Sequence, residues 1–263
     1  MTTVDFIIAL FCRVDEALGG VPKHPQAKLY PSEVVTVALL FALKGDGERA
    51  FYRWLVRDYR PLFPHLPERT RLFRLFAAHQ GWTDRFLAPP TVLGVADSYG
   101  VELLHPYREK RHPLPDRLGR KGLSNHRWIV GGKLAVVLNK WGLICGWAAD
   151  TANVHDSAFH PLIGRFAEDM IILADGNFAR KDDNPPNLKV CPRGTWNDRM
   201  LVETTFSMLT LICHAKHAIH RVWRYFTMRL AATVALFNML VQWDGLSFDE
   251  DGCAHRSIAQ FSL

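Results

Sequence analysis

The hydrophobic pattern of this chain changes at the sequence APP, residues 88–90. Before this point apolar residues recur every three or four positions, which is the spacing of amphipathic helices. After it they come in short runs rich in β-branched side chains, which are typical of buried strands. The change predicts an all-α N-terminal domain over 1–88 and a mixed α/β domain over 89–263.

Four helices are expected in the first region. They are VDFIIALFCRVDEAL near the N-terminus, a helix that begins at Pro31, the segment GERAFYRWLVRDYR, and PERTRLFRLFAAHQ. Proline in a first turn and an acid close behind it are common signals for the start of a helix. The arginines of these helices fit either a DNA-binding module of the helix-turn-helix type or an ordinary solvated surface.

The second region reads as strands and helices in alternation. The expected elements are a strand over 91–98 that ends at Asp97, a hairpin over 128–150, a helix over 155–166 with Asp156 as its N-cap, a strand that ends at Asp175, a helix that carries Glu203, and a helix over roughly 222–243. The stretches 105–128 and 179–196 are expected to be loops, and the tail after Trp243 is loosely patterned.

Composition narrows the class of protein. With 48% hydrophobic and 11% aromatic residues the chain can bury a substantial core. Its longest apolar runs, 34–43 and 230–241, are about half the roughly 20 residues of a membrane-spanning helix. No basic leader with a cleavage site is visible, so we expect a cytoplasmic protein without a membrane segment.

The cysteines do not form a recognisable site. There are five, scattered and without a CxxC pair, which argues against a zinc ribbon or a disulfide framework and fits a reducing compartment. Cys213 and His217 stand four positions apart and could face one metal ion from a helix, but a partly exposed polar or DNA-facing helix side is the better explanation.

Three acids stand where a metal site would place them. Asp97 and Asp175 each end an apolar run, and Glu203 lies on a helix whose apolar residues would pack against the sheet. Three converging carboxylates repel one another unless a cation neutralises them. Oxygen ligands suit Mg²⁺ or Mn²⁺, and two such ions can support phosphoryl transfer.

Each acid also has a simpler interpretation. An aspartate after a strand often forms a turn or caps a helix. Glu203 stands four positions after Arg199, so the two can form a surface ion pair. Asp150 ends an apolar strand as well and is a rival for the site.

Several stretches resemble a known family. VADSYGVEL, GGKLAVVLNKWGLICGWAADTANVHDS, LADGNF and RMLVETTFSML, in this order across most of 91–210, resemble bacterial insertion-sequence transposases of the DDE type. The helical region before these stretches also resembles the helical leader of such enzymes, but its resemblance is less specific. The resemblance implies an RNase H-like fold, with Asp97, Asp175 and Glu203 as catalytic ligands of two Mg²⁺ or Mn²⁺ ions. TANVHDS resembles a family motif outside the three acids, which weakens Asp150 as a rival.

The resemblance also implies an activity. Such an enzyme cleaves double-stranded DNA at the transposon ends, and the freed 3′-hydroxyl attacks target DNA. The N-terminal helices would bind transposon ends or dimerise, and a homodimer is expected because two ends must be paired. Two alternatives remain: an impaired or repurposed transposase that only binds DNA, and a metal-dependent nuclease without strand transfer.

The glutamate helix of many such enzymes carries the signature Tyr-x2-Arg-x3-Glu-x6-Lys. Here these positions hold Trp196, Arg199, Glu203 and Thr210. Tryptophan keeps an aromatic ring without the hydroxyl, and threonine lacks the charge that would contact a DNA phosphate. Lys216 or His214 could replace that charge. Arg199 is expected to orient Glu203 or to contact phosphate.

The basic residues are consistent with a DNA partner. The formal net charge is +6, and cations concentrate in the stretch 105–128, which could neutralise several phosphates. A solvated charged surface is the alternative. The expected DNA contacts there are Arg108, Lys110, Arg111, Arg120 and Lys121, to which Arg199, Trp196 and Lys216 are added. The helix expected from 214 onward would continue this positive face to Arg229.

Overall fold

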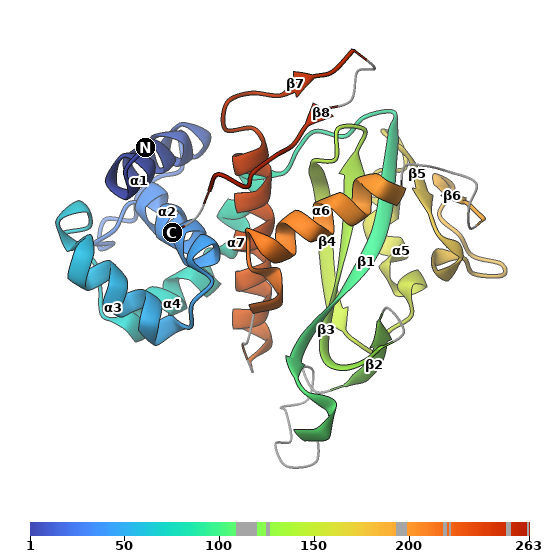
Figure 1. Cartoon of the computed structure of the whole chain (residues 1–263), viewed down its shortest axis with the longest axis horizontal. Coiled ribbons are helices and arrows are strands. Elements are labelled where there is room, and N and C mark those ends of the chain that lie inside the picture. The colour runs from blue at the N-terminus through green and yellow to red at the C-terminus, as the bar shows by residue number, and fades with distance from the viewer. Residues whose placement is uncertain are drawn as a thin grey trace.

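The computed structural model describes residues 1–108, 120–124, 127–192, 199–217, 220, 222–250, 254–261 and 263 (Figure 1). The side chains of Arg108, Arg199 and His217 are outside this description.

The four N-terminal helices are confirmed. They are α1 (Thr3–Ala17), α2 (Pro31–Lys44), α3 (Glu48–Asp58) and α4 (Arg69–Ala78). A short 3₁₀ helix, η1 (Arg60–Leu62), lies between α3 and α4, and a second one, η2 (Gln80–Phe86), follows α4. Thr2 and Asp5 form a capping box that starts α1. Almost every residue of α2 is buried, so this helix is the centre of the N-terminal helices.

A mixed six-stranded sheet follows these helices. Its strands are β1 (Leu93–Leu104), β2 (Lys121–Ser124), β3 (Arg127–Asn139), β4 (Ile144–Thr151), β5 (Ile171–Ala174) and β6 (Leu188–Val190). The order is β2-β3-β1-β5-β6, and β4 pairs with β3 beside β2. β3 is antiparallel to β1, β2 and β4, whereas β5 and β6 continue in parallel from β1. The fold is therefore mixed α/β, and the expected hairpin is present as β3 and β4.

Helices cover both faces of the sheet. On one face lie α6 (Arg199–Leu211) and α7 (Trp223–Val241), and α6 crosses over β1 in Figure 1. The close approach of Phe226 of α7 to Gly132 of β3 marks this face. The other face carries η4 (Asp156–Phe159) and α5 (His160–Gly164). Together η4 and α5 account for most of the residues of the helix predicted over 155–166.

Helix α7 ties the sheet to the N-terminal helices. It stands between them in Figure 1, and it contacts α2, α4 and η2 as well as α6 and β4. Residues 228–241 of α7 are all buried. The sheet and the helical region therefore share packing through a helix from the C-terminal part of the chain, and the division at residue 88 stays a prediction.

Three expectations about strands were wrong. β1 does not end at Asp97 but runs to Leu104, because alternate residues Tyr99, Val101 and Leu103 continue to be buried. The stretch 105–128 is not entirely loop, because β2 pairs with the start of β3. The expected loop 179–196 contains β6, which pairs with β5.

The helix expected over roughly 222–243 is confirmed as α7, but it does not extend back to His214, where the positive helix face was expected to begin. α6 ends at Leu211, a 3₁₀ helix η6 covers Ala215–His217, and α7 begins only at Trp223. Cys213 and His217 therefore do not share a helix face. Arg229 is also not part of a positive surface: it is 1% exposed, and its guanidinium lies 4.0 Å from the Phe41 ring centre.

The described residues of the tail after Trp243 pack in part against the core, through Ile258 and Phe261. Two-residue strands β7 (Ser247–Phe248) and β8 (Ala254–His255) pair with each other. Beyond them Phe261 is buried, with its ring centre 5.3 Å from that of Trp243. Within the described part of the chain, no helix combines the length and apolar character that crossing a membrane requires.

Candidate metal and DNA site

The parallel pairing of β1 and β5 brings Asp97 and Asp175 to the same level. The register joins Val95 to Leu173, and two further residues on each strand lead to the two aspartates. Residues two apart on a strand point to the same face, and neighbouring strands lie about 4.8 Å apart. Extended by two residues, this register leads the backbones of Asp97 and Asp175 to the same level, one residue past the end of β5 at Ala174.

Asp175 is half-buried and also caps a helical turn. Its Oδ1 accepts a hydrogen bond from the backbone N–H of Asn177 at 2.9 Å, and its Oδ2 accepts one from the Asn177 side-chain amide at 3.0 Å. This confirms that Asp175 acts as an N-cap, here of η5 (Gly176–Phe178). Each carboxylate oxygen has two lone pairs, so capping leaves acceptor capacity for a cation.

Behind Asp97 lies a buried polar network on the opposite face of the sheet. Asp97 Oδ1 accepts the backbone N–H of Ser98 at 2.7 Å, and the Ser98 hydroxyl donates to Asp156 Oδ1 at 2.5 Å. Lys133 Nζ donates to the same oxygen at 2.9 Å. The expected N-cap role of Asp156 was wrong: His155 caps η4, and Asp156 instead forms a buried ion pair with Lys133.

Asp150 is not brought to the same place as Asp97. It pairs with Lys133 in the β3–β4 register, and Lys133 pairs with Gly100, two residues from Ser98. Asp150 therefore lies on the face opposite Asp97. The geometry separates this rival from the other two aspartates.

Glu203 stands on the helix that covers the Asp97 face. Phe206, one turn later on α6, stacks on Tyr99 with 4.9 Å between ring centres. Tyr99 follows Asp97 by two residues and so shares its face, and Glu203 itself is exposed. Among the described residues, no three His, Cys, Asp or Glu side chains lie close enough together to hold a metal ion.

The other signature positions are only partly described. Trp196 lies outside the described residues, and only the backbone of Arg199 is described, as the first residue of α6. Thr210 is half-buried: its hydroxyl donates to Phe206 O at 2.7 Å and forms a short hydrogen bond with the Tyr99 hydroxyl. This residue therefore has a packing role in place of a lysine charge.

Of the two suggested substitutes for that charge, Lys216 is the better placed. Its ammonium lies 5.4 Å from the ring centre of Tyr99, the partner of Thr210. His214 instead packs against Gly45 at the end of α2, because a Cβ added to Gly45 would lie 2.6 Å from its ring. Lys216 is exposed and remains available to a phosphate.

The basic stretch after β1 is also partly described. Lys110 and Arg111 lie outside the described residues, and Arg108 ends a 3₁₀ helix, η3 (Pro106–Arg108). Arg120 and Lys121 are exposed. The Lys121 ammonium lies 5.1 Å from the ring centre of Trp128.

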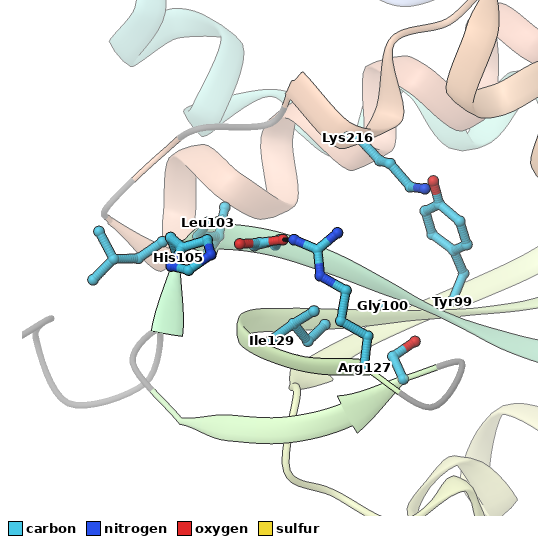
Figure 2. A pocket seen from close by; sticks show the side chains of 10 residues that line it. Tyr99, Gly100, Leu103, His105, Arg127, Ile129 and Lys216 are labelled. Atoms are coloured by element: carbon cyan, nitrogen blue, oxygen red, sulfur yellow. Dashed lines mark hydrogen bonds and ion pairs between the residues drawn. The ribbon is translucent and has the colours of Figure 1, made fainter. Parts of the chain in front are cut away.

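An open cavity of about 400 Å³ lies beside this site, at the end of β1 (Figure 2). In this view Lys216 and Tyr99 stand at one side of it and His105 at the other, and Arg127, which forms an ion pair with Glu102, lies between them. The cavity was not predicted, because its lining comes from β1, β2, β3 and η6 and no local motif joins these segments. Its size is within the range of small-ligand sites.

No protein-family model matches this chain, and no curated protein matches it either. The family resemblance therefore rests on the quoted motifs alone.

Proposed function

We propose that the protein is a DNA transposase of the DDE type. The observation that carries the proposal is the β1–β5 register, which leads to Asp97 and Asp175 two residues after its last pair, Val95 and Leu173. These two aspartates are 78 positions apart in the sequence, and both belong to stretches that resemble the family. Glu203, the third acid, stands on the helix that packs over the same face.

The strand arrangement supports an RNase H-like domain. Without the short β2, the order is β4-β3-β1-β5-β6, with β3 antiparallel to its neighbours and β5 and β6 parallel to β1. In the family that the motifs resemble, the second aspartate ends the fourth strand. Asp175 follows β5, which is the fourth strand of this set in chain order.

The donor set fits a hard divalent cation. Asp97 and Asp175, with Glu203, offer carboxylate oxygens of the kind that Mg²⁺ or Mn²⁺ binds. Ions held there would stabilise charge on a phosphate and activate an attacking oxygen. Lys216, Arg120 and Lys121 would hold DNA through its phosphates, so binding would weaken as salt increases.

The test is metal-dependent cleavage of a DNA duplex that carries the ends of the element encoding the chain. We expect cleavage with Mg²⁺ or Mn²⁺ by the wild type and none by Glu203→Gln, while both bind the duplex equally. Glu16→Gln is the matched control, because Glu16 is an exposed residue of α1, and this variant should cleave as the wild type does. Cleavage that survives Glu203→Gln would overturn the assignment of Glu203.

The same assay separates the alternatives. A nuclease without strand transfer would release cut ends but no joined products. A protein that only binds DNA would retain the duplex with no cleavage in either metal. The packing role of Thr210, in place of a phosphate-binding lysine, is the observation that favours this last alternative.

A further inference from the structure

An exposed apolar patch with cations around it lies at the β2–β3 end of the sheet. Leu123 and Trp128 are direct partners across the two strands, and they are 53% and 54% exposed. Lys121 leans over the Trp128 ring, and Arg120 is exposed next to it. An indole ring half in water and beside a lysine ammonium is an unusual surface for a strand, whose large apolar residues are normally covered.

This patch is on the same sheet face as Asp97. Trp128 and Val136 are both even-numbered residues of the unbroken strand β3, and Val136 pairs with Asp97. Between them Val130 and Leu134 are buried and Phe226 of α7 packs at Gly132, so the patch begins where the helices stop covering this face.

We propose that Trp128 and Leu123 form a stacking platform for an unpaired segment of nucleic acid, with Lys121 and Arg120 binding its phosphates. An indole face stacks on any base, and flanking cations follow the backbone, as in proteins that bind single strands without sequence preference. Lys121 already makes a cation–π contact with the ring and can turn to a phosphate when a base arrives.

The chemistry of the patch favours a single strand over other occupants. In a duplex the base faces are stacked on one another, so the indole would find no free face. A protein partner would be expected to pair the apolar residues without needing the cations. Among the described residues that line the nearby cavity, Arg127 and Lys216 are cations, and Glu102, which pairs with Arg127, is the one acid.

The experiment measures binding of a fluorescent oligodeoxythymidine and of a blunt duplex of equal length, by anisotropy with the full chain and with EDTA. We expect Trp128→Ala to weaken oligodeoxythymidine binding about tenfold or more, because loss of one stacked base has an effect of this size. Trp128→Phe keeps an aromatic face and should stay within about threefold of the wild type. Duplex binding should change much less in both variants.

Tyr30→Ala is the matched control. Tyr30 is also an exposed ring, with the Lys23 ammonium 4.0 Å from its centre, but it lies on the N-terminal helices. Its loss should leave binding of both DNAs unchanged. Thermal unfolding of each variant shows whether the fold is retained.

Three results would overturn the proposal. They are unchanged oligodeoxythymidine binding by Trp128→Ala, an equal loss of duplex binding, and a change of oligomeric state in Trp128→Ala with single-strand binding intact, which would assign the patch to a second copy. This inference extends the proposed function, but the assay contains no metal and measures no cleavage. The binding result with oligodeoxythymidine therefore tests the stacking platform even if the protein does not cleave DNA.

Discussion

Lys133 of β3 and Asp156 of η4 form an ion pair with 2.9 Å between Nζ and Oδ1, and both side chains are about nine-tenths buried. The same lysine donates to Val154 O at 2.9 Å, and Asp156 also accepts from Ser98. The pair therefore joins β3, β1 and the segment that follows β4, directly behind Asp97. Removing one partner would leave the other charge buried without compensation.

We predict that Lys133→Met lowers the free energy of unfolding by about 3 kcal/mol or more, as loss of one member of a buried pair does. Chemical denaturation at pH 7 measures this. Arg57→Met provides the control, because Arg57 and Asp58 form an exposed ion pair and its loss should not change stability measurably. Equal stability of Lys133→Met and the wild type would show that the buried pair contributes nothing.

Metal binding should depend on the two aspartates that the sheet brings together. Asp97→Asn and Asp175→Asn should each weaken Mn²⁺ binding at least about tenfold, since even residues behind a metal ligand commonly contribute that much. Isothermal titration calorimetry with Mn²⁺ alone measures the affinity. Asp182→Asn, in an exposed loop, should bind as the wild type does. Wild-type affinity in both Asn variants would contradict the site.

The hydrogen bond between Tyr99 and Thr210 should stabilise the contact of β1 with α6. Burial raises the pKa of the Tyr99 phenol, so the neutral hydroxyl is the form that bonds. We expect Tyr99→Phe and Thr210→Val each to lower stability by about 1 kcal/mol, and the double variant to lose less than the sum. Tyr30→Phe, at an exposed ring, is the control. Simple additivity would show that the two hydroxyls do not interact in solution.

His220 should make stability depend on pH. Burial, and then the charge of Arg229, lower its pKa to about 4, so at neutral pH its 3.6 Å contact with Glu48 is not an ion pair. The unfolded chain takes up a proton near pH 6.5 and the folded one only near pH 4, so stability falls as the pH decreases between these values.

The decrease from this group should approach about 3 kcal/mol at pH 4. Denaturation curves from pH 7.5 to 4 should show a shallower pH dependence for His220→Gln than for the wild type. Burial also raises the pKa of Glu48. This carboxyl adds a pH dependence of its own to the stability, which should be the same in the wild type and in His220→Gln. His24→Gln, at an exposed site, should match the wild type. Identical slopes for wild type and His220→Gln would disprove the prediction.

Local patterns in the sequence were enough to predict the elements that form through their own neighbours. The four N-terminal helices, the β3–β4 hairpin and the strand before Asp175 follow from apolar spacing, proline starts and a short turn. Asp175 and Glu203 were correctly placed after a strand and on a helix for the same reason.

Tertiary structure decided whatever depends on a distant partner. β1 continues past Asp97 because β3 supplies its hydrogen bonds, and β2 and β6 are too short to be recognised without the strands they pair with. The register of β1 against β5 leads Asp97 and Asp175 to the same level, and the alternation of β4 turns Asp150 to the other face. Hydrogen bonds between strands set these relationships, and the sequence of one strand carries little information about the register of another. The sequence by itself therefore determined which residues are candidates, and the pairing of strands decided which of them meet.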